Sequence, residues 1–194
     1  MQAEAIRIIH EEHHALTAML SAMRGVAERL REHADPRDFD VMRAILLYID
    51  EFPERLHHVK EHEVLFPLVR ARSPQTAAVL DRLDAEHQRG EAAVRALEHE
   101  LLGWEQLGAS RAPRFLESLQ AYSGFYLEHL RVEESEVLTA AQRTFDEADW
   151  EKVLRAFQGH RDPLTGQTPE ALYEGLFRKI VNQAPAPIGL GSRA

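Results

Sequence analysis

Apolar residues follow helical steps of three and four along most of the chain, and polar residues occupy the positions between them. The first stripe contains Ile6, Ile9, Leu16, Leu20, Met23, Ala27 and Leu30, and His13 lies inside it. A second stripe starts near Asp38 and contains Ile45, Ile49, Phe52 and Leu56, leading into residues 57–68. Pro53 lies within this second stripe and should bend the helix, because proline removes a backbone donor and crowds the preceding turn.

Two further stripes follow the Ser73-Pro74 break. The third contains Leu80, Leu83, His87, Gly90, Val94, Leu97 and Leu101, and Gly103 and Gly108 should end it. The fourth contains Phe115, Leu119, Tyr122, Tyr126, His129, Glu133 and Val137, with Pro113 near its start, where proline is tolerated. Because no segment alternates apolar and polar residues, the pattern predicts an all-α fold, an up-down-up-down four-helix bundle with short C-terminal helices.

The C-terminal part of the chain has a different pattern. A short helix is expected over residues 147–157, a turn over residues 162–166, and an amphipathic helix over residues 169–182. From Ala184 onward, proline and glycine interrupt any regular period. We therefore expect a bundle over residues 1–145, and over residues 146–194 a helical extension with a Pro/Gly tail packed on it.

Charge and composition narrow the possible partners. A formal net charge of -9 argues against nucleic acid and anionic membranes, since both are bound mainly through basic side chains. No apolar run approaches the length of a membrane span, and no N-terminal targeting pattern is evident. The absence of cysteine fits a cytoplasmic protein and leaves only nitrogen and oxygen atoms as metal ligands. The composition leaves open whether the protein forms a homodimer.

Polar residues enter the four core stripes in an arrangement that repeats once. Glu12-His13 and Glu86-His87 lie at the same phase of the first and third helices, whereas the second and fourth carry His57-x-x-x-Glu61 and His129-x-x-x-Glu133. The separation of the paired histidines is 44 residues in the first half and 42 in the second. The repeat predicts a site with approximate two-fold symmetry at one height of the bundle.

The six core residues form a set that suits metal ions. Positions four apart share a helix face, so each His-x-x-x-Glu brings an imidazole and a carboxylate to one place. One such pair is common on solvated helix faces, and one core histidine usually has a hydrogen-bonding partner. Burying all six without a shared partner would cost several kcal/mol each. Imidazole and carboxylate suit iron, manganese or zinc, and the count fits two ions bridged by Glu61 and Glu133.

These motifs resemble those of the hemerythrin-like, or HHE cation-binding, family. The segment from His57 to Pro67 is similar to the family's second-helix motif, and residues 129–134 are similar to its fourth-helix motif. The resemblance implies a non-haem di-iron centre (Fe2+/Fe3+), usually with an oxo or hydroxo bridge. By motif matching, it implies that the metal ligands are His13, His57, Glu61, His87, His129 and Glu133.

Several residues beside the six candidate ligands could support the metal site without binding the metal. Oxygen-carrying hemerythrins have a histidine one turn after the third-helix ligand, where this chain has Glu91, so the resemblance does not imply simple oxygen carriage. Glu12, Glu86 and Glu128 precede candidate ligands and either orient an imidazole or remain solvated. The residues expected to lie beside the ligands and to support them are His58, His62, Glu91, Tyr122 and Tyr126. The two tyrosines either face a bound oxygen species or pack in the core.

Three functions are compatible with this site. The first is a di-iron protein that binds or senses dioxygen, nitric oxide or peroxide, or that handles iron. The second is a di-metal oxidoreductase that decomposes peroxide, and the third is a structural helical scaffold that holds zinc or no metal. The sequence does not decide between the three or establish that the chain is an enzyme.

Overall fold

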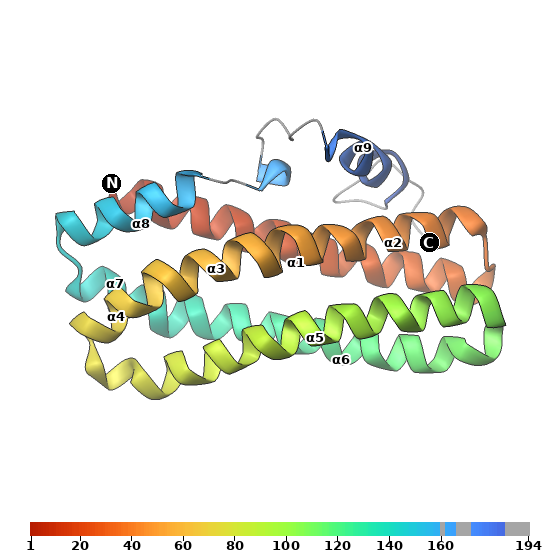
Figure 1. Cartoon of the computed structure of the whole chain (residues 1–194), viewed down its shortest axis with the longest axis horizontal. Coiled ribbons are helices and arrows are strands. Elements are labelled where there is room, and N and C mark those ends of the chain that lie inside the picture. Colours follow the sequence, from red (N-terminus) through yellow and green to blue (C-terminus); the bar gives the residue numbers. More distant parts are fainter. Residues whose placement is uncertain (160–161, 166–171, 185–194) are drawn as a thin grey trace.

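The computed structural model describes residues 1–159, 162–165 and 172–184, and every regular element among them is helical. Four antiparallel rods form a bundle (Figure 1). The first rod is α1 (Gln2–Glu32) and the third is α5 (Ala77–Leu107). The second consists of α2 (Pro36–Ile49), α3 (His58–Lys60) and α4 (Phe66–Arg72), and the fourth of α6 (Ala112–Val132) and α7 (Leu138–Thr144). The predicted all-α, up-down-up-down fold is confirmed.

Local signals explain most of the helix ends. The Asp35 side chain caps α2 by accepting a hydrogen bond from the backbone N–H of Arg37, so this helix begins at Pro36, slightly earlier than predicted. Helix α5 continues through Gly103 and ends before Gly108, whose φ of 90° favours glycine. The prediction that Gly103 also ends the helix is wrong, since a single glycine costs an interior turn only about 1 kcal/mol. Single 3₁₀ turns, η3 (Pro74–Thr76) and η4 (Ala109–Arg111), connect the later rods.

The second and fourth rods contain wide π-helical turns. These are η1 (Asp50–His57), η2 (Glu61–Leu65) and η5 (Glu133–Val137). Pro53 lies inside η1, so the disturbance expected from this proline takes the form of a π segment. A π turn holds more residues than an α turn, and consecutive side chains are therefore closer in direction. As a result, both His57 and His58 are buried, although they are adjacent in sequence.

The apolar core consists of two separate clusters. One lies around the α1–α2 connection and includes Met23, Ile45 and Phe115, and the other lies at the opposite end and includes Ile8, Val69 and Val137. On the first three rods the candidate metal ligands fall between these two groups of apolar residues, and on the fourth rod they lie where the two groups meet. The bundle therefore has a polar layer in its interior between two hydrophobic regions.

The C-terminal extension packs on the outside of the bundle (Figure 1). Helix α8 (Glu147–Gly159) contacts α1, and α9 (Glu174–Gln183) contacts α2. Between them lies the 3₁₀ turn η6 (Pro163–Thr165) at the predicted turn. The last helix begins later than predicted, because residues 172–173 form a turn in which Tyr173 bonds the Glu51 carboxylate. The predicted start at Pro169 and the predicted tail packing lie outside the described residues, and the boundary at residue 145 stays a prediction.

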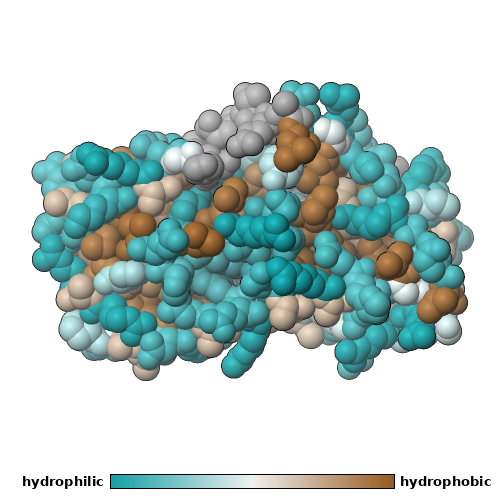
Figure 2. All heavy atoms as spheres, in the orientation of Figure 1, coloured by the Kyte–Doolittle hydropathy of each residue, from teal (hydrophilic) through white to brown (hydrophobic). Residues whose placement is uncertain are grey.

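The visible surface is mostly hydrophilic, with hydrophobic side chains scattered between the polar ones (Figure 2). Among the described residues, no helix is both long enough and apolar enough to cross a bilayer.

Candidate metal centre

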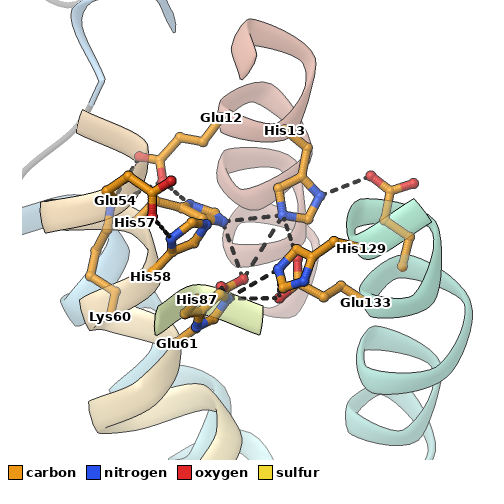
Figure 3. Close-up of polar contacts among 11 residues, drawn as sticks. Glu12, His13, Glu54, His57, His58, Lys60, Glu61, His87, His129 and Glu133 are labelled. Carbon is orange, nitrogen blue, oxygen red and sulfur yellow. Dashed lines mark hydrogen bonds and ion pairs between the residues drawn. The ribbon is translucent and has the colours of Figure 1, made fainter. Parts of the chain in front are cut away.

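The fold brings the six predicted ligand residues together in the polar layer (Figure 3). Helix α1 carries His13, the second rod carries His57 and Glu61, α5 carries His87, and the fourth rod carries His129 and Glu133. Each of these six residues is buried, with at most 9% of its surface exposed.

The four imidazoles form two pairs. The Nε2 atoms of His13 and His57 are 3.1 Å apart, and those of His87 and His129 are 3.0 Å apart. Each pair joins the two helices of one hairpin, as the internal repeat predicts. In each pair two Nε2 atoms face each other, which leaves lone pairs in contact unless a proton or a cation lies between them.

Two carboxylates lie between the pairs, and each faces both. Glu61 has Oε1 at 3.1 Å from Nε2 of His57, and its Oε2 lies 3.4 Å from Nε2 of His87. Glu133 has Oε1 and Oε2 each 3.5 Å from an imidazole nitrogen, Oε1 from His129 and Oε2 from His13. A carboxylate with one oxygen toward each histidine pair has the arrangement of a bridge between two cations.

The outward nitrogens of three of these imidazoles are held by other carboxylates. Nδ1 of His57 donates to Glu12 at 2.7 Å, and Nδ1 of His129 donates to Glu86 at 2.9 Å. Nδ1 of His13 donates to Glu134 at 3.0 Å. These bonds place the N–H on the outer nitrogen, so that Nε2 presents a lone pair to the interior.

The site also contains buried polar atoms that have no hydrogen-bond partner in the part of the chain that the structure describes. They are Oε2 of Glu61, both carboxylate oxygens of Glu133 and Nε2 of His58. Leaving such atoms unpaired in the interior costs roughly 1–3 kcal/mol each, and more when they are charged. Because all of these atoms are good ligands for a divalent cation, the residues fit a metal centre.

Charge is distributed unevenly over the site. Burial lowers the pKa of His57, but Glu61 and Glu12 outweigh this effect and raise it to about 10. Burial similarly opposes a charge on His129, whose pKa Glu133 and Glu86 nevertheless raise to about 9. Burial lowers the pKa of His87 to about 2, and the neighbouring His58 adds to this effect. In the metal-free protein, protonated His57 and His129 therefore supply the positive charge beside the carboxylates that metal ions would otherwise supply.

The pKa values of the two bridging carboxylates, Glu61 and Glu133, are shifted in opposite directions. Burial opposes ionisation of Glu61, but His57 and His13 hold its pKa well below the usual value. Burial raises the pKa of Glu133, and repulsion from the ionised Glu61 raises it further. Two carboxylates this close are ionised together only when additional positive charge is present.

Comparison with known protein families matches residues 4–141 to the hemerythrin HHE cation binding domain. The chain belongs to this family. No curated protein matches the sequence. The match covers all four rods of the bundle, so the buried His/Glu layer is the part of this HHE domain that is consistent with a cation site.

His58 lies closer to the centre of this HHE domain than the sequence indicated. Its ring stacks on that of His87 with 4.0 Å between centroids, and its Nδ1 donates to Glu54 at 3.1 Å. The ligand atoms of His58, His87 and His129 lie within 4.8 Å of one another. The hydroxyls of Tyr122 and Tyr126 both donate to Glu54, so neither phenol is directed at the carboxylate bridge. Burial raises the pKa of Glu54 to about 7, against these two hydrogen bonds.

Two other predicted neighbours lie at the edge of the site. The His62 side chain is exposed and contacts Asp84, and Glu91 is half exposed and pairs with Arg95. Both line an open groove of about 290 Å³ that reaches the centre at Glu54, His58 and His87. Glu128, predicted to orient an imidazole or to be solvated, pairs with Arg131 on the surface. The groove is the open side of the centre.

The His13–His57 side of the centre has much less open space than the groove. A cavity of about 10 Å³, lined by His13, His57, Lys60 and Asp162 among others, has room for about one water molecule. Lys60 donates to Glu12 at 2.9 Å, and Asp162 accepts a hydrogen bond from Tyr48. Asp162 belongs to the C-terminal extension, which thus covers the His13–His57 half.

The sequence indicated some of these partners and missed others. Glu12 and Glu86 precede candidate ligands, and of the two roles left open for them the structure shows the first, because each carboxylate accepts a hydrogen bond from an imidazole. Glu54 was missed, although its spacing of four from His58 is a signal for a contact on one helix face. Glu134 and Asp162 contact their partners from distant parts of the chain, and no local pattern indicates such contacts.

Proposed function

We propose that this HHE domain holds two iron ions and binds a small ligand, namely dioxygen, nitric oxide or peroxide, in sensing, detoxification or iron handling. One ion would be held by His13 and His57, the other by His87 and His129, and both by Glu61 and Glu133. The observation that supports this most directly is the position of the two carboxylates, each with one oxygen toward each histidine pair.

The donor set supports iron more than a lone structural zinc. Six nitrogen- and oxygen-bearing groups exceed what one tetrahedral ion uses, and a pair of octahedral ions would have positions left over for a ligand. Bound iron supplies redox chemistry and such vacant positions. The protein's own contribution is to fix the imidazoles through Glu12, Glu86 and Glu134 and to limit access to the groove side.

Metal content and the visible spectrum test this proposal directly. Protein expressed with added iron and purified without chelator should contain two iron atoms per chain and show a charge-transfer band. His129→Ala should lose the band and most of the metal, whereas the control His99→Ala changes an exposed residue of α5 and should retain both. One zinc atom, or no metal, would overturn the proposal and favour the scaffold.

The double substitution Glu61→Gln with Glu133→Gln separates the di-iron site from a scaffold. On our proposal it strips the metal, because an amide is a weaker ligand and cannot supply the negative charge that two cations require. A scaffold would retain its folding and metal content.

A peroxide-decomposing oxidoreductase is the second candidate, and the groove that reaches His87 supports it because peroxide is small enough to enter. Iron-loaded protein should then consume hydrogen peroxide over many turnovers, and His57→Ala should abolish the activity. A stoichiometric spectral change with nitric oxide or peroxide, without turnover, supports a binder or sensor instead.

A further inference from the structure

The internal repeat relates the two hairpins residue by residue, and it breaks next to the metal centre. His57 corresponds to His129 and Glu61 to Glu133, so His58 corresponds to Leu130 and Glu54 to Tyr126. Leu130 is buried, with 6% of its surface exposed, and belongs to the larger hydrophobic cluster. One hairpin thus fills this core position with an apolar residue, and the other fills it with an imidazole.

An imidazole at this position is costly unless it has partners at both nitrogens. His58 is only 4% exposed, and its Nδ1 donates to Glu54. Its Nε2 is fully buried and has no hydrogen-bond partner among the described residues. The cost of an unpaired buried group is roughly 1–3 kcal/mol, which Leu130 avoids on the other hairpin.

His58 is held in the same way as three of the predicted ligands. His13, His57 and His129 each have Nδ1 bound to a carboxylate and Nε2 turned to the interior, and His58 repeats this with Glu54. Tyr122 and Tyr126 donate to Glu54 and thereby fix the carboxylate that orients His58 (Figure 3 shows Glu54 and His58). Carboxylate–histidine pairs of this kind fix the tautomer and ring orientation of metal-binding imidazoles.

We propose that His58 is a fifth imidazole ligand and serves the half of the centre that contains His87 and His129. The inference rests on the proposed two-ion site. It makes the two ions differ in their ligands, with three imidazoles on one ion and two on the other. His58 would also supply an imidazole that α5 does not supply at Glu91, because the Glu91 side chain points outward and pairs with Arg95. His58 and His87 both line the groove, so the three-imidazole half is the one that an incoming ligand meets first.

Cobalt(II) binding to the metal-free full-length protein tests the inference without any activity. We would compare the wild type with His58→Leu, which installs the residue that the repeat carries at Leu130. His62→Ala is the matched control, because it removes an exposed histidine of the same rod from the same groove. Wild type and control should bind two equivalents, whereas His58→Leu should bind one tightly and the second about tenfold or more weaker.

Proton NMR of the wild-type cobalt form provides a second readout. A ligated imidazole that keeps its Nδ1–H gives one strongly shifted, solvent-exchangeable signal. We expect five such signals in the wild type, with the one from His58 absent in His58→Leu. The number of signals in the wild type does not depend on how well the variant folds.

The outcomes separate the two proposals. Two unchanged equivalents in His58→Leu, or four exchangeable signals in the wild type, would overturn the role of His58 and leave the two-ion site in place. Fewer than two cobalt ions in the wild type would overturn both.

Discussion

Gly90 of α5 provides a quantitative test of the packing around the centre. A Cβ atom at this position would lie 2.0 Å from the hydroxyl oxygen of Tyr126, 2.8 Å from its Cζ and 3.0 Å from Oε1 of Glu54. Tyr126 has no exposed surface and lies against the His58 ring, so it cannot swing away. Gly90 therefore permits the close packing of Tyr126 against α5.

Gly90→Ala should therefore destabilise the protein. Overpacking costs about 1–3 kcal/mol and weakening the Tyr126–Glu54 hydrogen bond about 1.5–3 kcal/mol, whereas the helix gains about 1 kcal/mol when alanine replaces glycine. The net loss in free energy of unfolding should be roughly 1.5–5 kcal/mol. Denaturant unfolding of the metal-free protein measures this quantity.

Two comparisons make the test specific. In Gly124→Ala of α6, the new Cβ has no atom of the other described residues within 4 Å beyond its own helix backbone, so the change should stabilise the protein by up to about 1 kcal/mol. In a Tyr126→Phe background the closest contact disappears, so Gly90→Ala should cost less there. If Gly90→Ala is as stable as Gly124→Ala, the tight packing of Tyr126 against α5 is wrong.

The remaining predictions concern charge, the extension and metal binding. The pKa of His57 is about 10 in the folded protein and about 6.5 in the unfolded chain. The contribution of His57 to the stability of the metal-free protein is therefore complete below about pH 6.5 and disappears as the pH rises toward 10. Unfolding curves at pH 6.5 and 10 should show a loss that His57→Gln diminishes; an increase with pH contradicts this reasoning. Phe177→Ala should cost about 3 kcal/mol, because this ring packs on Tyr48 and Phe52, whereas exposed Leu172→Ala should be neutral; equal midpoints would count against the packing. Metal uptake should release protons, measurable with an indicator dye in weak buffer, because a cation replaces the proton on His57; uptake without release contradicts protonation of the pair.

The sequence predicted the parts of the structure that depend on helical period. His13, His87 and His129 lie on regular α-helices, and their positions in apolar stripes were enough to place them in the core. His58 was placed outside the ligand set because the internal repeat favours His57 and Glu61 as the ligands of this helix. An α-helix turns neighbouring side chains further apart than a π-helix does, and a hydrophobic pattern does not indicate the π turns of the second rod, which bring His58 toward the centre.

Contacts between segments that are distant in sequence were the second kind of feature that the sequence could not predict. The contact of Glu134 with His13 depends on how α1 lies against the fourth rod, and that of Asp162 with Tyr48 on where the extension crosses α2. Both arise from tertiary packing, for which a single sequence has no periodic signal. The last helix was likewise placed too early, because the contact of Tyr173 with Glu51 depends on docking rather than on propensity.

The polar layer between the two hydrophobic clusters has a consequence for how the bundle unfolds. Each cluster can retain its own packing while the layer between them is disrupted, since few apolar contacts tie one end to the other. Without cations, the two ends should behave as separate cooperative units, and amide hydrogen exchange should detect the opening of one before the other. Two ions held by residues from all four rods would act as a cross-link at mid-height and join both ends into a single folding unit.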